Sequence, residues 1–176
     1  MMKYALVYLI EGDARAYHGT LTHELSQNFG IKNLSEKIIP HLTLKSPFYL
    51  DDISPVEGIV GRFSNSLCPF TFALEGFGHF DKEVIFMDTR CPEEMEVIPS
   101  EIVPALREIR GISFSPYDES GNYHATLAYA SSVEQFKQIM DFLQKKEPPY
   151  FQLALDNLAI IKKPDKKWEI HKKYGF

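Results

Sequence analysis

The chain of 176 residues is long enough to form one domain with a buried core, and its 44% hydrophobic and 24% charged residues are typical of a soluble globular protein. The net charge of −5 at pH 7 argues against a protein that coats nucleic acid in general. No apolar run reaches the roughly 18 residues of a transmembrane helix, so we expect no membrane span.

The first two elements follow from local patterns. Lys3–Ile10 is short and rich in β-branched and aromatic residues, which predicts a strand buried on both faces. Apolar residues then recur every four positions, which predicts a helix over 13–28 that begins at an Asp13 cap and ends at Gly30. The chain therefore opens with a strand and an amphipathic helix.

The remaining elements follow from similar signals. Pro40 favours extended backbone at Ile39, so a strand should begin at His41. Ser54 and Ser132 stand where helix caps are expected. The predicted elements are a strand over 41–47, a helix over 54–66, strands over 70–80 and 83–89, a helix over 100–110, an extended stretch at 112–114, a strand beginning at 124, a helix over 132–146, and a hairpin of 151–161 and 167–174 that turns at 164–165.

One four-residue pattern occurs on two of the predicted strands, as His41-Leu42-Thr43-Leu44 and as His124-Ala125-Thr126-Leu127. Side chains on a strand alternate between faces, so the histidine and threonine of each copy should point the same way. A third copy, His18-Gly19-Thr20-Leu21, falls in a predicted helix, where residues two apart diverge by about 200°, and we interpret it as coincidence. Two motif strands side by side would place two imidazoles and two hydroxyls in one groove.

This set of groups suits in-line displacement at phosphorus. One imidazole can deprotonate the nucleophile while the other protonates the leaving oxygen, because both ionisation states are available near neutral pH. The hydroxyls would donate hydrogen bonds to the non-bridging phosphate oxygens. The sequence offers no acidic cluster or glycine-rich phosphate loop beside the histidines, so we expect neither a metal nor another cofactor. We predict His41, Thr43, His124 and Thr126 as catalytic residues.

Three further residues are candidate substrate contacts. Lys45 and Asn122 fall on the predicted strand faces of the two motifs, where Lys45 could add positive charge and Asn122 a polar contact. The alternatives are a solvated lysine at a strand end and an asparagine in a turn. Tyr8 would stack on a base or ribose if its face of the first strand lines the groove, and would otherwise pack in the core.

Two features of composition bear on partners and compartment. Six lysines near the end of the chain form either a solvated hairpin face or a weak landing surface for phosphates; they are Lys162, Lys163, Lys166, Lys167, Lys172 and Lys173. The two cysteines, Cys68 and Cys91, lack the spacing of a metal site, and a disulfide framework is not indicated. A reducing cytoplasm is the simpler interpretation.

The order of elements repeats along the chain. The sequence of helix, motif strand, helix and hairpin occurs twice, although the residues outside the motif do not repeat. This order predicts an α+β fold with mainly antiparallel sheets, helices outside and a central groove. We expect one domain, residues 1–176, made of two similar halves with the groove between them.

The paired motifs resemble those of the 2H phosphoesterase superfamily, which includes 2′-5′ RNA ligases and cyclic phosphodiesterases. The resemblance implies a LigT-like fold of two lobes that are related by a pseudo-two-fold axis. It also implies metal-independent hydrolysis or transfer at a 2′,3′-cyclic phosphate or 2′-5′ linkage of nucleotides or RNA ends. His41, Thr43, His124 and Thr126 match the family's catalytic positions. The segments that carry the resemblance are PHLTLK (40–45), LEGFGHF (74–80), EVIFMD (83–88), YHATLAYA (123–130) and LALDNLAIIKKPDKKWEI (153–170).

The sequence also departs from many relatives. They carry an arginine soon after the second motif, where this chain has Ala128 and Tyr129, and those that handle RNA ends tend to be more basic. These differences favour a small cyclic nucleotide or a loosely held RNA terminus as the substrate. Two alternatives stay open, namely a nucleotide- or RNA-binding module with little turnover and a 2′-5′ RNA ligase. We expect a cytoplasmic monomer.

Overall fold

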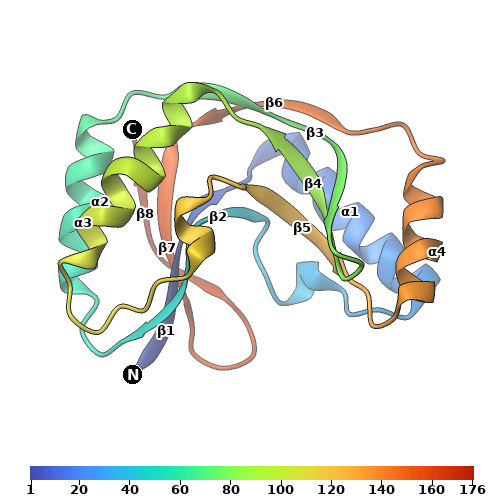
Figure 1. Ribbon diagram of the computed structural model, residues 1–176, viewed down its shortest axis with the longest axis horizontal. Coiled ribbons are helices and arrows are strands. Elements are labelled where there is room, and N and C mark those ends of the chain that lie inside the picture. The colour runs from blue at the N-terminus through green and yellow to red at the C-terminus, as the bar shows by residue number, and fades with distance from the viewer.

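Two four-stranded antiparallel sheets form the centre of the computed structural model, which describes residues 1–176 (Figure 1). The first sheet has the strand order β2 (His41–Leu50), β1 (Met2–Leu9), β7 (Asn157–Lys163) and β8 (Glu169–Gly175). The second has the order β5 (His124–Tyr129), β4 (Val84–Arg90), β3 (Phe70–Phe80) and β6 (Tyr150–Leu155). The predicted α+β fold with antiparallel sheets is confirmed, and each motif strand, β2 or β5, lies at the edge of its sheet.

The helices cover the sheets in a crossed pattern. α1 (Gly12–Phe29) follows β1 but contacts β5 in the other sheet, and α4 (Val133–Leu143) packs beside it. α2 (Ser54–Ser66) contacts β7 and β8, and α3 (Val103–Arg107) packs against α2 although it follows β4. The left lobe in Figure 1 therefore holds the first sheet with α2 and α3, and the right lobe holds the second sheet with α1 and α4. None of these helices is both long and apolar enough to cross a bilayer.

This crossing corrects one expectation drawn from the order of elements. The hairpin of β3 and β4, which comes from the first half of the sequence, joins the sheet of β5. The hairpin of β7 and β8, from the second half, joins the sheet of β2. Each lobe is therefore built from both halves of the chain, because each half passes its hairpin to the other sheet.

Apolar side chains from both sheets and all four α-helices form one cluster of 35 buried residues. A second cluster of six lies on the opposite face of β1 and β7 and consists of Ala5, Val7, Leu9, Ala159, Ile161 and Trp168. β1 is thus buried on both faces, as its composition predicts. Burial of this apolar area is the main favourable contribution to folding, and it holds the two lobes together.

The helix ends follow the predictions in part. Gly30 ends α1 in the left-handed conformation with φ 64°, which glycine adopts without strain, and the Ser132 side chain caps α4. α1 begins before Asp13, and no side chain caps it. Ser54 is the first residue of α2 and does not cap it: the N-cap position is Ile53, which offers no capping side chain, and the backbone N–H of Ser54 donates to the carboxylate of Asp52.

Two segments are more irregular than predicted. The helix expected over 100–110 begins earlier, as a π-helix at Ile98–Ile102 that leads into α3. Pro104 has no N–H to donate to the preceding turn, which is consistent with a break from regular α geometry at this point. Residues 112–114 join neither sheet. The loop that follows contains a short 3-10 helix, Pro116–Glu119; the others are Leu34–Glu36 and Glu93–Glu96.

Two predicted strands have different bounds in the structure. β2 continues past Pro47 to Leu50, because an edge strand tolerates proline and its pairing with β1 is irregular there. The strand expected over 151–161 is two strands, β6 and β7, which belong to different sheets. The sequence has no glycine or proline at this crossing to mark the break.

Candidate active site

A β-bulge follows the threonine of each motif strand. The pairing of β2 with β1 skips Leu44, and the pairing of β5 with β4 skips Leu127. Up to the bulge, side chains alternate, so the histidine and threonine of each motif share a face and stay partly accessible. The extra residue shifts this alternation, and the next residues, Lys45 and Ala128, are fully buried. Each motif therefore presents two polar side chains and then turns inward.

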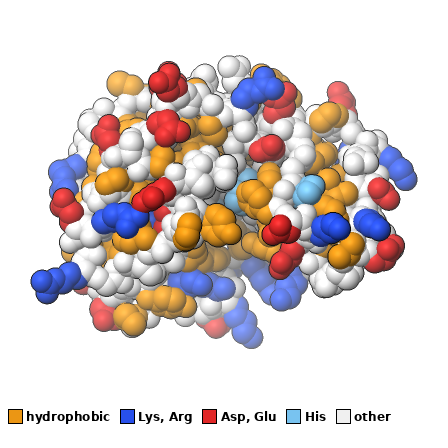
Figure 2. Space-filling view, viewed as in Figure 1, with side chains coloured by type: hydrophobic (Ala, Val, Ile, Leu, Met, Phe, Trp, Pro, Cys, Tyr) orange, Lys and Arg blue, Asp and Glu red, His pale blue; other side chains and the backbone are white.

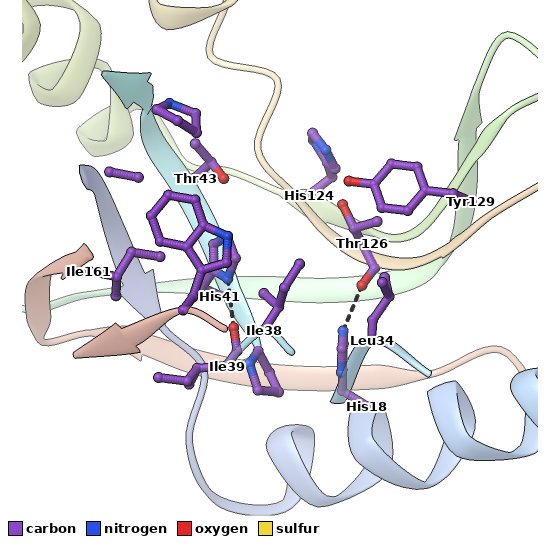
Figure 3. A pocket seen from close by; sticks show the side chains of 14 residues that line it. His18, Leu34, Ile38, Ile39, His41, Thr43, His124, Thr126, Tyr129 and Ile161 are labelled. Atoms are coloured by element: carbon purple, nitrogen blue, oxygen red, sulfur yellow. Dashed lines mark hydrogen bonds between the residues drawn. The ribbon is translucent and has the colours of Figure 1, made fainter. Parts of the chain in front are cut away.

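The two motifs line one pocket between the lobes, with a cavity volume of about 220 Å³ (Figure 3). β2 supplies His41 and Thr43, and β5 supplies His124 and Thr126 from the facing side. The structure thus brings the four residues together, as the motif spacing predicts. The rest of the lining is largely apolar or aromatic and consists of Ala5, Leu34, Ile38, Ile39, Pro40, Pro47, Ile161, Trp168, Tyr129 and His18. In Figure 2 histidine atoms appear beside a hollow near the middle of the face.

The two motif imidazoles are held in the same way. Nδ1–H of His41 donates to the carbonyl of Ile39 at 2.6 Å, and Nδ1–H of His124 donates to the carbonyl of Asn122 at 2.9 Å. Each acceptor lies two residues before its histidine. Because a carbonyl can only accept, Nδ1 carries the proton and Nε2 is left for the pocket. Both rings therefore present the nitrogen that can exchange a proton with substrate.

Aromatic rings surround His124. Its imidazole packs edge-on against Phe80 at 4.7 Å and at a tilt against Phe86 at 4.8 Å between ring centroids. Gly78 makes this packing possible, because a Cβ at this position would lie 2.4 Å from the Phe86 ring. The sequence gives no direct sign of this arrangement, since Gly78 reads as an ordinary strand glycine.

Burial lowers the pKa of both motif histidines. For His41, burial acts against the charged imidazolium, the hydrogen bond to Ile39 acts in its favour, and a charge on His124 adds repulsion. For His124, burial again lowers the pKa, while the bond to Asn122 and the nearby Asp88 carboxylate favour the charged form. The charged form of His41 is thus disfavoured by His124, whereas the charged form of His124 is favoured by the Asp88 carboxylate.

His18 lines the same pocket, which the sequence reasoning missed. Its pairing with Thr20 is indeed impossible on α1, but His18 by itself is 3% exposed, and Nε2–H donates to the carbonyl of Thr126 at 2.8 Å. Figure 3 shows this bond joining α1 to the second motif. Nδ1 is buried without a partner, so a second proton would leave an unsatisfied charged donor. Burial accordingly lowers the pKa of His18 to about 4, with a smaller effect of His41 in the same direction.

This histidine should make folding sensitive to acid. Between about pH 4 and 6.5 the unfolded chain binds a proton at His18 that the folded chain does not, so stability falls as the pH falls through this window. In the His18→Gln variant the amide can keep the hydrogen bond to Thr126 without taking up a proton. When the pH falls from about 7 to 4.5, we therefore expect the unfolding free energy of this variant to drop by about 2–3 kcal/mol less than that of the parent. Urea unfolding at the two pH values measures this difference, and equal losses in both proteins would contradict it.

The three predicted substrate contacts lie outside this pocket. The bulge turns Lys45 inward, where Nζ pairs with the Asp118 carboxylate at 3.0 Å and donates to the carbonyls of Ser46 and Ser113. It is fully buried and adds no charge to the groove. Its role in the structure is to tie β2 to the segment that precedes β5.

Tyr8 and Asn122 are corrected in a similar way. Tyr8 packs edge-on against Phe72 at 5.3 Å in the main core, because the pocket lies on the other face of β1, the face of Ala5. The Asn122 side chain is exposed and is not part of the pocket lining. Only its backbone carbonyl serves the site, as the acceptor for His124.

The C-terminal lysines divide into two groups. Lys172 pairs with Glu57 at 2.8 Å and Lys173 with Glu11 at 2.7 Å, so these two belong to a paired surface of β8. The other four form no ion pair, and Lys163 lies over the ring of Trp168. No group of three or more His, Cys, Asp or Glu side chains is arranged to hold a metal ion.

Comparisons with known proteins point to one family. The model of the 2′-5′ RNA ligase superfamily matches residues 16–167. The protein TT0787 of Thermus thermophilus has a similar structure, with a TM-score of 0.71 and 16% identity over 99% of this chain and 97% of that one. E. coli LigT, solved with NADP+, has a TM-score of 0.57 and 13% identity, over 99% of this chain and 98% of that one. A search of curated proteins found no match.

Proposed function

This chain belongs to the 2′-5′ RNA ligase superfamily, and from that membership we propose that its pocket is the active site of a metal-independent phosphoesterase. The substrate would be a 2′,3′-cyclic phosphate or a 2′-5′ linkage of a nucleotide or RNA end. The observation that carries the proposal is the matched pair of His-x-Thr strands, whose imidazoles both present Nε2 to one cavity. E. coli LigT has been solved with 3′-AMP and with ATP, which agrees with a nucleotide-sized ligand.

The proposed reaction is general acid–base catalysis of water attack on phosphorus. Nε2 of one neutral imidazole takes a proton from water as its oxygen bonds to phosphorus. The bond from phosphorus to the 2′ or 3′ oxygen breaks, and the other imidazolium gives that oxygen a proton. One histidine ends protonated and the other neutral, and exchange with solvent restores the starting state.

The surroundings of the histidines favour one assignment of roles. His41 acts as the base, because burial and repulsion from a charged His124 keep it neutral. His124 acts as the acid, because the Asp88 carboxylate supports its charged form. The Thr43 and Thr126 hydroxyls, which line the same pocket as the rings, donate to the non-bridging oxygens and stabilise the negative charge that develops there.

A direct assay tests the proposal. The EDTA-treated protein is incubated with the four nucleoside 2′,3′-cyclic phosphates, a 2′-5′-linked dinucleotide, and RNA ending in a cyclic phosphate. We expect a monophosphate product from at least one of them, at a rate that added EDTA does not change. Tight binding of AMP or CMP by calorimetry without any product would instead support the alternative of a binding module.

A further inference from the structure

A second pocket adjoins the one that holds the histidines. Its cavity volume is about 280 Å³, and it shares Ile38, Ile39 and Pro40 with the first as a common wall. α1 contributes Arg15 and Gly19 to its lining, and the loop between β7 and β8 contributes Lys167. The two pockets are thus neighbouring parts of one groove.

The second pocket differs from the first in charge. Arg15 and Lys167 are its only charged lining residues, and neither forms an ion pair. Glu36 and Asp165 lie in the two adjacent segments, but neither lines the pocket. A protein with a net charge of −5 therefore carries two unpaired cations at one end of this groove.

The loop that carries Lys167 is anchored at its base. The backbone N–H of Trp168 donates to the carbonyl of Lys37 at 2.9 Å, and the Trp168 side chain is 9% exposed in the small core cluster. Lys167 is therefore attached directly beside a fixed residue that also lines the first pocket. Arg15 is on a long helix, one turn before Gly19 on the same face. Both cations thus stand on supported backbone.

Space for a ligand exists between them. A Cβ at Gly19 would have no atom within 4 Å, so this part of α1 leaves the pocket open. An arginine guanidinium and a lysine ammonium that face an open space suit a phosphate, because both donate charge-assisted hydrogen bonds to its oxygens. A phosphate bound here would lie next to, and apart from, the phosphate between the histidines.

We propose that the Arg15–Lys167 pocket binds a second phosphate of the substrate, the one on the 5′ oxygen of the nucleoside whose 2′,3′-cyclic phosphate meets the histidines. This inference rests on the proposed function and names its substrate class. The enzyme then prefers nucleotides with phosphates on both sides of the ribose over nucleoside 2′,3′-cyclic phosphates. Such a phosphate occurs as the last internal linkage of an RNA end or as a free 5′-phosphate.

The test compares three substrates at low salt. They are adenosine 2′,3′-cyclic phosphate, the same compound with a 5′-phosphate, and a dinucleotide that ends in the cyclic phosphate. We expect kcat/KM to be on the order of tenfold higher for the second and third than for the first, and the advantage to shrink as salt screens the contact. If kcat/KM is higher for the dinucleotide alone, the pocket is assigned to RNA ends. If kcat/KM is higher for the 5′-phosphorylated compound alone, the pocket is assigned to bisphosphorylated mononucleotides.

Two variants and a matched control locate the effect. In the double variant Arg15→Gln/Lys167→Gln, the advantage in kcat/KM of the substrates with a second phosphate should fall to about onefold. In Gly19→Gln the longer side chain should reduce this advantage because it occupies the pocket without changing its charge. Lys137→Gln/Lys145→Gln removes the same charge from exposed residues that line neither pocket, and should keep the full advantage. An equal advantage in all variants, or none in the parent, overturns the inference.

A binding measurement separates this inference from the proposed function. Calorimetry with 3′-AMP and adenosine 3′,5′-bisphosphate should give the same tenfold ratio in Kd, with the same dependence on Arg15 and Lys167. If adenosine 2′,3′-cyclic phosphate is hydrolysed but the two ligands bind with equal Kd, the second phosphate site is contradicted and the catalytic proposal stands. If the tenfold ratio in Kd is found but no substrate is hydrolysed, the catalytic proposal is contradicted and the second phosphate site stands.

Discussion

The His41→Ala and His124→Ala variants are each expected to hydrolyse a 2′,3′-cyclic nucleotide about 10²- to 10⁴-fold more slowly than the parent, the usual contribution of a positioned general acid or base. The two histidines act in one step, so the double variant should be little slower than either single variant. Initial rates of product formation measure the loss. His23→Ala is the matched control, because His23 is exposed on α1 and lies outside the pocket.

The pH profile provides an independent check on the same pair. One ring must be neutral and the other charged, so kcat/KM should follow a bell-shaped curve. Burial lowers the pKa of both rings from 6.5, so the maximum should lie on the acid side of that value. Undiminished activity in both alanine variants, or a rate that rises steadily through neutral pH, contradicts the two-histidine mechanism.

The Lys45→Met variant should lose about 3–5 kcal/mol of unfolding free energy. Removal of the ammonium leaves the buried Asp118 carboxylate without its counter-ion. Burial raises the pKa of Asp118, but hydrogen bonds from Ser46, Ser115 and Lys45 outweigh it and hold that pKa below its usual range, so the carboxylate stays charged at neutral pH. Urea unfolding at about pH 7 measures the loss.

A surface pair gives the matched control. Lys146 pairs with Glu24 at 2.9 Å, and both side chains are about one-third exposed. Lys146→Met should therefore cost no more than about 1 kcal/mol, since solvent screens this pair. A loss of similar size in the two variants would mean that the Lys45 pair is no more important than a surface contact.

Periodicity in the sequence predicts the parts of the site that depend on local backbone alone. His41 and Thr43, and likewise His124 and Thr126, share a face because strand geometry requires residues two apart to do so. Patterns within single elements, namely hydrophobic periodicity with cap and turn residues, also predict most of the strands and helices and the antiparallel α+β class. The error for Lys45 has an equally clear cause. The bulge at Leu44 depends on the register in which β2 pairs with β1, and the sequence of β2 alone does not show that register.

Long-range packing decides what the sequence pattern leaves open. His18 belongs to the site because α1 crosses to the other sheet and reaches the carbonyl of Thr126, more than 100 residues along the chain. The exchange of hairpins between lobes and the meeting of Arg15 with Lys167 in one pocket have the same origin. The two His-x-Thr strands can be predicted from local sequence, because alternation is a property of one strand. The other residues of the pocket depend on tertiary packing, because those contacts arise when separate elements bury their apolar faces together.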